Sequence, residues 1–315
     1  MARRIDKLRL KAQPYVEWAD TSFAGRLYAR LLELELVDRA VALAAKLFLA
    51  FFPFVLAISV FSPPDVRAWV TDALINRLGL RGYSLDQLRG AFVAASESKA
   101  AIGIIGLIFL FFYATSFATA LQRAYLRAWR RPGGGGLRNK GRGAGWLASM
   151  VVFLALTGLA GSFLRDVPVP GTFYVIATVF MTGLWWWTAR LMLRGEVRWI
   201  PLLPGAVITA LMMITYIAAA PIWMPSAVAS NQSQFGYFGV TLSLVSYFVG
   251  VAFVVVIGAA SAPVLAEGSS RFSVWLRGPG DQSLEPGARP ALPAPNRKLK
   301  LADALGFPAR DKPDA

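Results

Sequence analysis

Three arginines in the middle of the chain share one face of a predicted helix. Arg123, Arg127 and Arg130 are spaced four and three residues apart, and the helix continues from a long apolar segment. Guanidinium groups bind phosphate oxygens through paired hydrogen bonds. The spacing therefore predicts a contact for an anionic, phosphate-bearing group. The surrounding stretch 121–146 contains no acid, and its other basic residues are Arg131, Arg138, Lys140 and Arg142.

The same stretch has two other interpretations. One is a cytoplasmic loop whose positive charge fixes the orientation of the membrane spans beside it. The other is a nucleic-acid-binding arm, which would need interleaved aromatic residues or a recognised binding fold. The stretch has neither, and four glycines, Gly133 to Gly136, interrupt it. We therefore expect no nucleic-acid partner.

Lys46 is the remaining basic residue that could contact a substrate, because it lies inside a predicted membrane span. It is close to the cytoplasmic end of that span. Its side chain could therefore extend to the lipid headgroups, or it could line a cavity and contact an anionic lipid. Pro53 lies further along the same span and predicts a kink, since proline removes one helical hydrogen bond.

The residue types that are missing exclude much enzyme chemistry. The chain has no cysteine and no histidine, so thiolate and imidazole groups cannot act as nucleophiles, bases or metal ligands. None of the 18 acidic residues falls within a predicted span, which argues against a simple carboxylate proton relay. We therefore expect a protein that is not an enzyme and has no catalytic residue, metal ion or cofactor.

The composition predicts an all-α, polytopic membrane protein. Apolar residues make up 56% of the 315 residues and charged residues only 16%, whereas a soluble domain has about a quarter charged. Mean hydropathy is +0.50. Apolar segments of about 20 residues are long enough to cross a hydrocarbon core of about 30 Å. Six such spans are predicted, at 41–60, 101–120, 146–163, 171–191, 200–220 and 240–260, within a transmembrane domain 41–265.

The segments outside the spans differ in character. Residues 1–40 predict a cytoplasmic, amphipathic N-terminal segment, 62–96 an outer interfacial helical hairpin, and 221–239 an uncharged loop. Residues 266–315 predict a disordered, basic, proline-rich cytoplasmic tail. Small residues are predicted at close helix contacts or kinks: Gly103, Gly106, Gly236 and Gly239.

The distribution of charge predicts the orientation. With both termini inside, most of the 33 basic residues fall in cytoplasmic segments, including Arg190, Arg194 and Arg198 after the fourth span. The second outer loop contains only Arg165, and the third contains no basic residue. A bias of this kind predicts that both termini are cytoplasmic.

Four segments resemble one protein family. They are 42–58 with its internal proline, 120–129 with its Ala-Leu-x-Arg-Ala start, 235–239 (FGYFG), and 257–267 at the end of the sixth span. In order and spacing they are similar to the YihY/BrkB family of bacterial inner-membrane proteins, which includes the YhjD envelope proteins. The chain departs from the family pattern at Ala45-Lys46, where an aromatic pair is usual, and at Ala260, where an acid is usual.

The resemblance implies a multi-pass bacterial inner-membrane protein with a role in envelope integrity or lipid transport. Combined with the arginine face, it predicts a protein that moves or organises an anionic, lipid-like substrate, with anionic membrane lipids as its partners. One alternative is a structural scaffold of the envelope that binds other envelope proteins and transports nothing. A ribonuclease, the activity historically attached to the family, is disfavoured because the sequence shows no metal-binding cluster. The sequence does not predict an oligomeric state.

Overall fold

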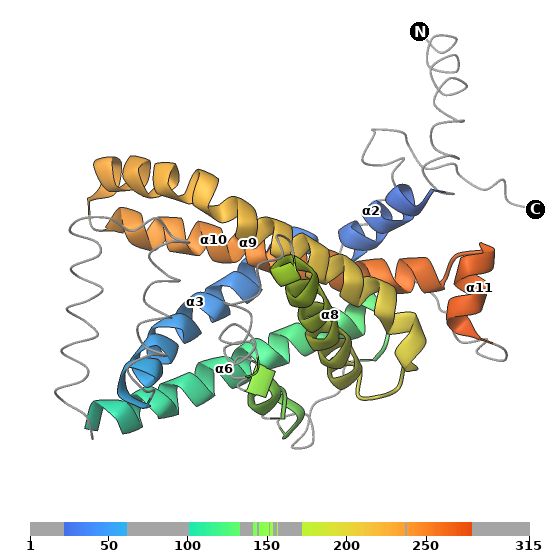
Figure 1. Ribbon diagram of the computed structural model, residues 1–315, viewed down its shortest axis with the longest axis horizontal. Coiled ribbons are helices and arrows are strands. Elements are labelled where there is room, and N and C mark those ends of the chain that lie inside the picture. Colours follow the sequence, from blue (N-terminus) through green and yellow to red (C-terminus); the bar gives the residue numbers. More distant parts are fainter. Residues whose placement is uncertain are drawn as a thin grey trace, which may run out of the picture.

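The computed structural model describes residues 22–61, 101–132, 172–236 and 238–278, with short pieces at 141–143, 145–150, 152–153 and 156. Every regular element within these residues is helical, which confirms the predicted all-α class for this part of the chain. The helices are shown in Figure 1.

A short amphipathic helix precedes the first long one. Helix α2 (Phe23–Glu33) begins at Ser22, whose hydroxyl accepts a hydrogen bond of 3.0 Å from the amide of Gly25. This N-cap satisfies one of the amide groups that the first helical turn leaves unpaired. Leu27 and Leu31 of α2 pack against the core. Glu35 follows in a left-handed conformation (φ 56°) and turns the chain into α3 (Leu36–Phe61).

Five further helices complete the described fold. They are α6 (Ala101–Ala128), α8 (Thr172–Met192), α9 (Trp199–Phe235), α10 (Phe238–Ala266) and α11 (Arg271–Arg277). Among the described residues, three segments are long and apolar enough to cross a membrane: Gly106–Ala128, Trp199–Phe235 and Phe238–Ala266. Helices α3 and α8 coincide with the predicted spans 41–60 and 171–191, and the predicted span 146–163 is described only in pieces. The count of six spans therefore stays a prediction.

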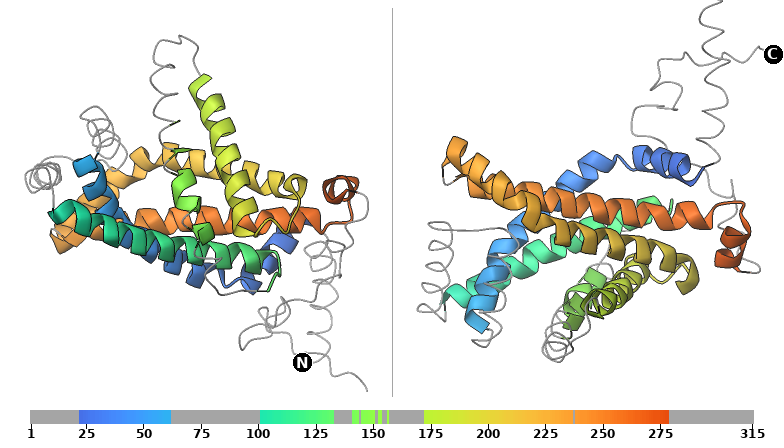
Figure 2. Two further views of the ribbon diagram at one scale, coloured as in Figure 1. Left: turned by 90° about the horizontal axis from the view of Figure 1, so that it is seen from below. Right: turned by 45° about the horizontal axis from the view of Figure 1, so that its top comes forward.

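The end of α9 was predicted wrongly. Residues 221–235 were expected to form a loop, but they continue α9, which reaches Phe235 and contains Pro204, Pro221 and Pro225. The helix continues because its second half packs along α10 (Figures 1 and 2). Asn231 also donates a hydrogen bond of 2.8 Å to Ser243 on α10. These contacts offset the hydrogen bonds that the prolines remove.

The packing of α9 on α10 is the most extensive in the described fold. Small residues allow the two backbones to approach closely. A Cβ atom added at Gly205 would lie 2.5 Å from the Cβ of Ala262, and one added at Gly239 would lie 2.3 Å from the carbonyl of Asn231. Gly239, a predicted packing position, therefore lies directly against α9. The two helices run side by side in both views of Figure 2.

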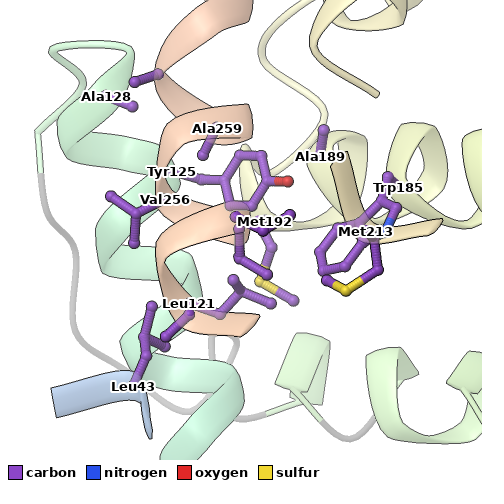
Figure 3. Close-up of a cluster of buried hydrophobic side chains, with 14 of the residues drawn as sticks. Leu43, Leu121, Tyr125, Ala128, Trp185, Ala189, Met192, Met213, Val256 and Ala259 are labelled. Atoms are coloured by element: carbon purple, nitrogen blue, oxygen red, sulfur yellow. The ribbon is translucent and has the colours of Figure 1, made fainter. Parts of the chain in front are cut away.

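The remaining helices pack around this pair. Helix α3 contacts both α6 and α10, and α8 contacts α9. The core formed between them is apolar (Figure 3). Tyr125 extends from α6 toward Met192 on α8, and Met213 of α9 lies beside Trp185. Leu43, Leu121 and Val256 complete this part of the core from α3, α6 and α10, respectively.

Several predicted features lie outside the described residues. These are residues 1–21, the interfacial hairpin 62–96, the glycines Gly133 to Gly136 and the part of the predicted tail 266–315 that begins at 279. The prediction of a disordered tail is wrong for residues 271–277, which form α11, because Ser270 caps this helix and Leu276 is buried. Gly103 belongs to the first turn of α6, where only the backbone is described. The remaining small-residue positions are described: Gly106 is buried, and Pro53 is buried within α3.

Candidate anion-binding site at the ends of α2, α3 and α6

The predicted arginine face is not one continuous helical surface. Helix α6 ends at Ala128, and Arg130 adopts a left-handed conformation with φ 49°. The amide of Arg131 then bonds to the carbonyl of Leu126 at 2.8 Å, which closes the helix end as in a Schellman motif. Arg123 and Arg127 thus lie on the helix, whereas Arg130 lies beyond it. The prediction that all three arginines share one helical face is wrong for Arg130.

Arg130 forms a salt bridge with the carboxylate of Glu33 on α2. Its Nη2 lies 2.8 Å from Oε2 of Glu33, and its Nε lies 3.1 Å from Oε1 of the same residue. Burial alone would lower the pKa of Arg130, but the hydrogen bonds and negative charge of Glu33 outweigh it and raise the pKa above its ordinary value. This fork-to-fork pair joins the end of α6 to α2. Arg130 is therefore a structural residue.

A second structural arginine is Arg30, which is 4% exposed. Its guanidinium donates to the carbonyl of Ala128 at the end of α6 and to the carboxylate of Glu267, which follows α10 directly. Its Nε also lies 3.7 Å from Oε2 of Glu33. A buried cation with these partners has its charge and its donors compensated. Arg30 thus connects the ends of α2, α6 and α10.

Two arginines share a single carboxylate beside this structural network, and a third arginine lies one helical turn away on α6. Nη2 of Arg127 lies 4.0 Å from Oε2 of Glu35, and Nη2 of Arg39 lies 3.8 Å from the same oxygen. Arg123, one helical turn before Arg127, is exposed and forms no ion pair with any described residue. We name Arg39, Arg123 and Arg127 the arginine cluster. It has more positive charge than Glu35 can neutralise.

The pKa of Arg39 reflects this crowding. Burial lowers it most, and the charges of Arg127 and Arg123 lower it further, while Glu35 and Asp38 act in the opposite direction. The guanidinium stays protonated, because its ordinary pKa is far above neutral pH. The net effect is an electrostatic cost that a bound anion would reduce.

The arginine cluster also contains an unused donor. Nε of Arg127 is buried and has no hydrogen-bond partner among the described residues. Other donors of the cluster bond to backbone carbonyls. Nε of Arg39 donates to the carbonyl of Leu34 at 2.7 Å, and Nη2 of Arg127 donates to the carbonyl of Glu33 at 3.5 Å. A buried donor without a partner costs free energy. An oxyanion at this position would supply the acceptor.

Lys46 belongs to α3 and contacts α6, the two helices that carry the arginine cluster. Its Nζ donates a hydrogen bond of 2.7 Å to Oγ of Ser116 on α6. The side chain is half-buried and forms no ion pair within the described part of the chain. The structure thus places Lys46 between α3 and α6.

The other predicted positions lie apart from this site. Gly236 ends α9 with φ 58°, and a Cβ atom there would meet no atom within 4 Å, so it serves the turn rather than close packing. Gly239 and Pro53 pack within the bundle. Across the described ranges, no group of three or more Asp or Glu side chains is placed to hold a metal ion.

Sequence reasoning missed four participants: Glu33, Glu35, Arg39 and Ser116. Arg39 had a recognisable signal, because it precedes Lys46 by seven residues and so lies on the same face of a helix. For the two glutamates the sequence signals only their local partners: Glu33 lies three residues after Arg30, and Glu35 lies four residues before Arg39. Their partners on the other segment, Arg130 and Arg127, lie more than 90 residues away in the sequence, and only the folded chain brings them together.

Comparison with known proteins identifies the family. The model of the family described as virulence factor BrkB matches residues 27–274, from α2 to α11. A search of curated proteins and a search of solved structures found no match. The matched region contains the three apolar helices long enough to cross a membrane, which agrees with a membrane protein of the cell envelope. The chain therefore belongs to the BrkB family, as its sequence motifs predicted.

Proposed function

We propose that this membrane protein binds an anionic lipid headgroup at the arginine cluster and moves or organises that lipid. The observation that carries the proposal is the excess of positive charge at Arg39, Arg123 and Arg127. Arg39 and Arg127 share one carboxylate, Arg123 has no ion pair with a described residue, and Arg127 keeps a buried, unused donor. Guanidinium groups favour phosphate ligands with several oxygens. The proposed function needs no catalytic residue, metal ion or cofactor.

The proposal places the protein in the bacterial inner membrane with both termini in the cytoplasm. The arginine cluster then lies at the cytoplasmic surface, where anionic headgroups attract basic side chains. The ends of α2, α3 and α6 would meet the membrane at headgroup level. A lipid could reach the exposed guanidinium of Arg123 from the bilayer.

Binding and movement of phosphatidylglycerol test the proposal. The purified full-length protein is reconstituted into phosphatidylcholine vesicles that contain a fluorescent phosphatidylglycerol, and the rate at which the label crosses the bilayer is measured by chemical quenching. Binding is measured separately by native mass spectrometry in detergent. We expect faster movement than in protein-free vesicles, and preferential binding of phosphatidylglycerol over phosphatidylcholine.

Arg123→Gln is the informative variant because Arg123 is exposed and has no structural partner among the described residues. Loss of one charge-assisted contact should weaken phosphatidylglycerol binding about tenfold. Arg271→Gln is the matched control, since Arg271 is also exposed and begins α11, outside the arginine cluster. Equal binding of both lipids by the wild-type protein would refute the proposal.

A structural scaffold is the second candidate function, and the length of α9 favours it. Its 37 residues correspond to roughly 55 Å of helix, whereas a hydrocarbon core is about 30 Å thick. The end of the helical pair near Phe235 and Phe238 would therefore project beyond the bilayer, and both rings are exposed. Site-specific crosslinking from Phe235 in whole cells tests this function. We expect a defined protein partner if the scaffold function is correct, and only lipid adducts if it is not.

A further inference from the structure

The positions of Arg39 and Lys46 on α3 match those of Arg123 and Ser116 on α6. Lys46 follows Arg39 by seven residues, and Ser116 precedes Arg123 by seven residues. Seven residues are about two helical turns, or about 10 Å along the axis. Since Arg39 is close enough to Arg123 to feel its charge and Lys46 bonds to Ser116, the two helices run antiparallel along this seam.

No carboxylate among the described residues neutralises the charge of Lys46 beside Ser116. Its hydrogen bond to Ser116 keeps the ammonium group about two turns along α6 from Arg123. An ammonium group has three donor hydrogens, and the structure shows an acceptor for one of them. Among the described residues no carboxylate pairs with it. A cation in an apolar segment is costly unless an anion or water reaches it.

Small side chains separate the two positions on the exposed side of the seam. Two residues of α3 lie between Arg39 and Lys46 on this face: Leu43 is buried in the core, and Ala42 is exposed beside it. On α6, Thr119 and Ala120 lie between Ser116 and Arg123. Thr119 bonds to the carbonyl of Thr115 in its own helix at 2.9 Å, so its hydroxyl is turned back onto the backbone. Leu43 therefore closes the buried side of the seam between the arginine cluster and Lys46, whereas Ala42, Thr119 and Ala120 place no bulky side chain on its exposed side.

We infer that Lys46 and Ser116 form a second anion site within the membrane, and that a phosphate-bearing lipid headgroup passes along the α3–α6 seam between it and the arginine cluster. This inference rests on the proposed function and extends it. The headgroup phosphate leaves the guanidinium groups of the arginine cluster and is then bound by the Lys46 ammonium and the Ser116 hydroxyl. The acyl chains stay in the bilayer, beside the exposed face of α3 that includes Val41, Leu49 and Phe52.

The contact between Lys46 and Ser116 also resembles a nucleophile with a lysine base. The surroundings of Ser116 argue against such a role. Ser116 lies in the middle of α6, so the neighbouring backbone amides are engaged in helical hydrogen bonds. They cannot serve as the oxyanion donors that acyl transfer requires. An anion site needs no such donors.

Two substitutions in the full-length protein test the inference in the vesicle assay. Lys46→Met removes the charge and keeps an unbranched side chain. Ala42→Phe keeps every charge and places a large ring in the seam. We expect each to slow phosphatidylglycerol movement about tenfold while the protein still binds phosphatidylglycerol in detergent, because the arginine cluster is intact. Lys46→Arg should retain most of the movement.

Ala45→Phe is the matched control for Ala42→Phe. Ala45 is also exposed on α3, but it lies about 60° further around the helix and away from the Arg39–Lys46 line. The ring at this position should leave movement unchanged. Thermal unfolding of each variant checks that the bundle is intact.

The outcomes separate the inference from the proposed function. No binding and no movement by the wild-type protein would refute the proposed function itself. Normal movement by Lys46→Met, with binding and movement by the wild type established, would overturn the second site alone. Inorganic phosphate, added on both sides of the vesicle membrane, tests the source of the anion. Inhibition of phosphatidylglycerol movement by this phosphate would mean that the two sites bind free phosphate and not the lipid headgroup. Labelling of Ser116 by a fluorophosphonate, lost in Lys46→Met, would instead establish a reactive serine.

Discussion

Thr209 on α9 fills the space beside Gly258 on α10. A Cβ atom at Gly258 would lie 1.9 Å from Oγ1 of Thr209, a hydroxyl that also bonds to the carbonyl of Gly205 at 2.7 Å. Thr209 is fully buried. In apolar helices, small residues of this kind allow close backbone approach, and packing then supplies much of the association energy. The contact between α9 and α10 therefore depends on the absence of a side chain at position 258.

Gly258→Ala should destabilise the protein. The added methyl group must displace Thr209, and overpacking of this kind costs about 1–3 kcal/mol. Gly183→Ala is the control, because Gly183 lies within α8 and nothing lies within 4 Å of its added Cβ atom. Alanine there should be neutral or stabilising by up to about 1 kcal/mol. Denaturant unfolding in detergent measures both. Equal stability of the two variants would contradict the packing described.

Glu267→Gln should also destabilise the fold. The substitution removes the charge that faces the buried guanidinium of Arg30, and breaking a buried ion pair costs about 3–5 kcal/mol. Glu196→Gln is the matched control, because Glu196 is exposed and lies 3.8 Å from Arg131. An exposed pair contributes about 0–1 kcal/mol. Thermal unfolding at low and high salt separates the two cases, since only the exposed pair is screened strongly.

Thr188→Val should cost about 1–3 kcal/mol, because it leaves a buried donor unpaired. The indole Nε1 of Trp146 donates to Oγ1 of Thr188 at 3.1 Å, and Thr188 is fully buried. Thr188→Ser keeps the hydroxyl and should retain most of this stability. Tryptophan fluorescence during unfolding provides the readout. Wild-type stability of Thr188→Val would show that the hydrogen bond does not contribute, and an equal loss in Thr188→Ser would show that the methyl group contributes as much as the hydroxyl.

Gly236→Ala should strain the turn between α9 and α10. Gly236 has φ 58° and ψ −134°, a combination that residues with a side chain rarely adopt. A backbone forced into such a region costs about 1–3 kcal/mol. Since no atom lies within 4 Å of an added Cβ atom, any loss of stability comes from the backbone conformation alone. Unchanged unfolding would show that the turn relaxes to another conformation.

The sequence predicts the helices of this protein better than their ends. Long apolar segments identify α3, α6, α8, α9 and α10, because few soluble structures tolerate such runs. The end of α9 was placed too early, since Pro221 and Pro225 are local helix breakers. The packing of α9 on α10 and the hydrogen bond from Asn231 to Ser243 override that local signal. Such contacts depend on tertiary structure and cannot be derived from propensity.

The candidate site could be predicted only in part. Arg123 and Arg127 were identified by residue type and spacing, because helical periodicity places both on one surface. Arg130 was assigned the same role, yet it pairs with Glu33. The division between the structural arginines and the arginine cluster depends on which acids the folded chain brings to each of them. Helical spacing cannot predict that, because it describes each helix separately.

The contacts of Arg30 also set an order of events during synthesis. Arg30 leaves the ribosome before either long-range partner exists: Ala128 follows 98 residues later and Glu267 follows 237 residues later. Until the last long helix has entered the membrane, its guanidinium cannot complete its set of hydrogen bonds. Closure of the bundle at this end is therefore a late step in biogenesis. A chain that stops before Glu267 would leave α2 without its anchor to α10.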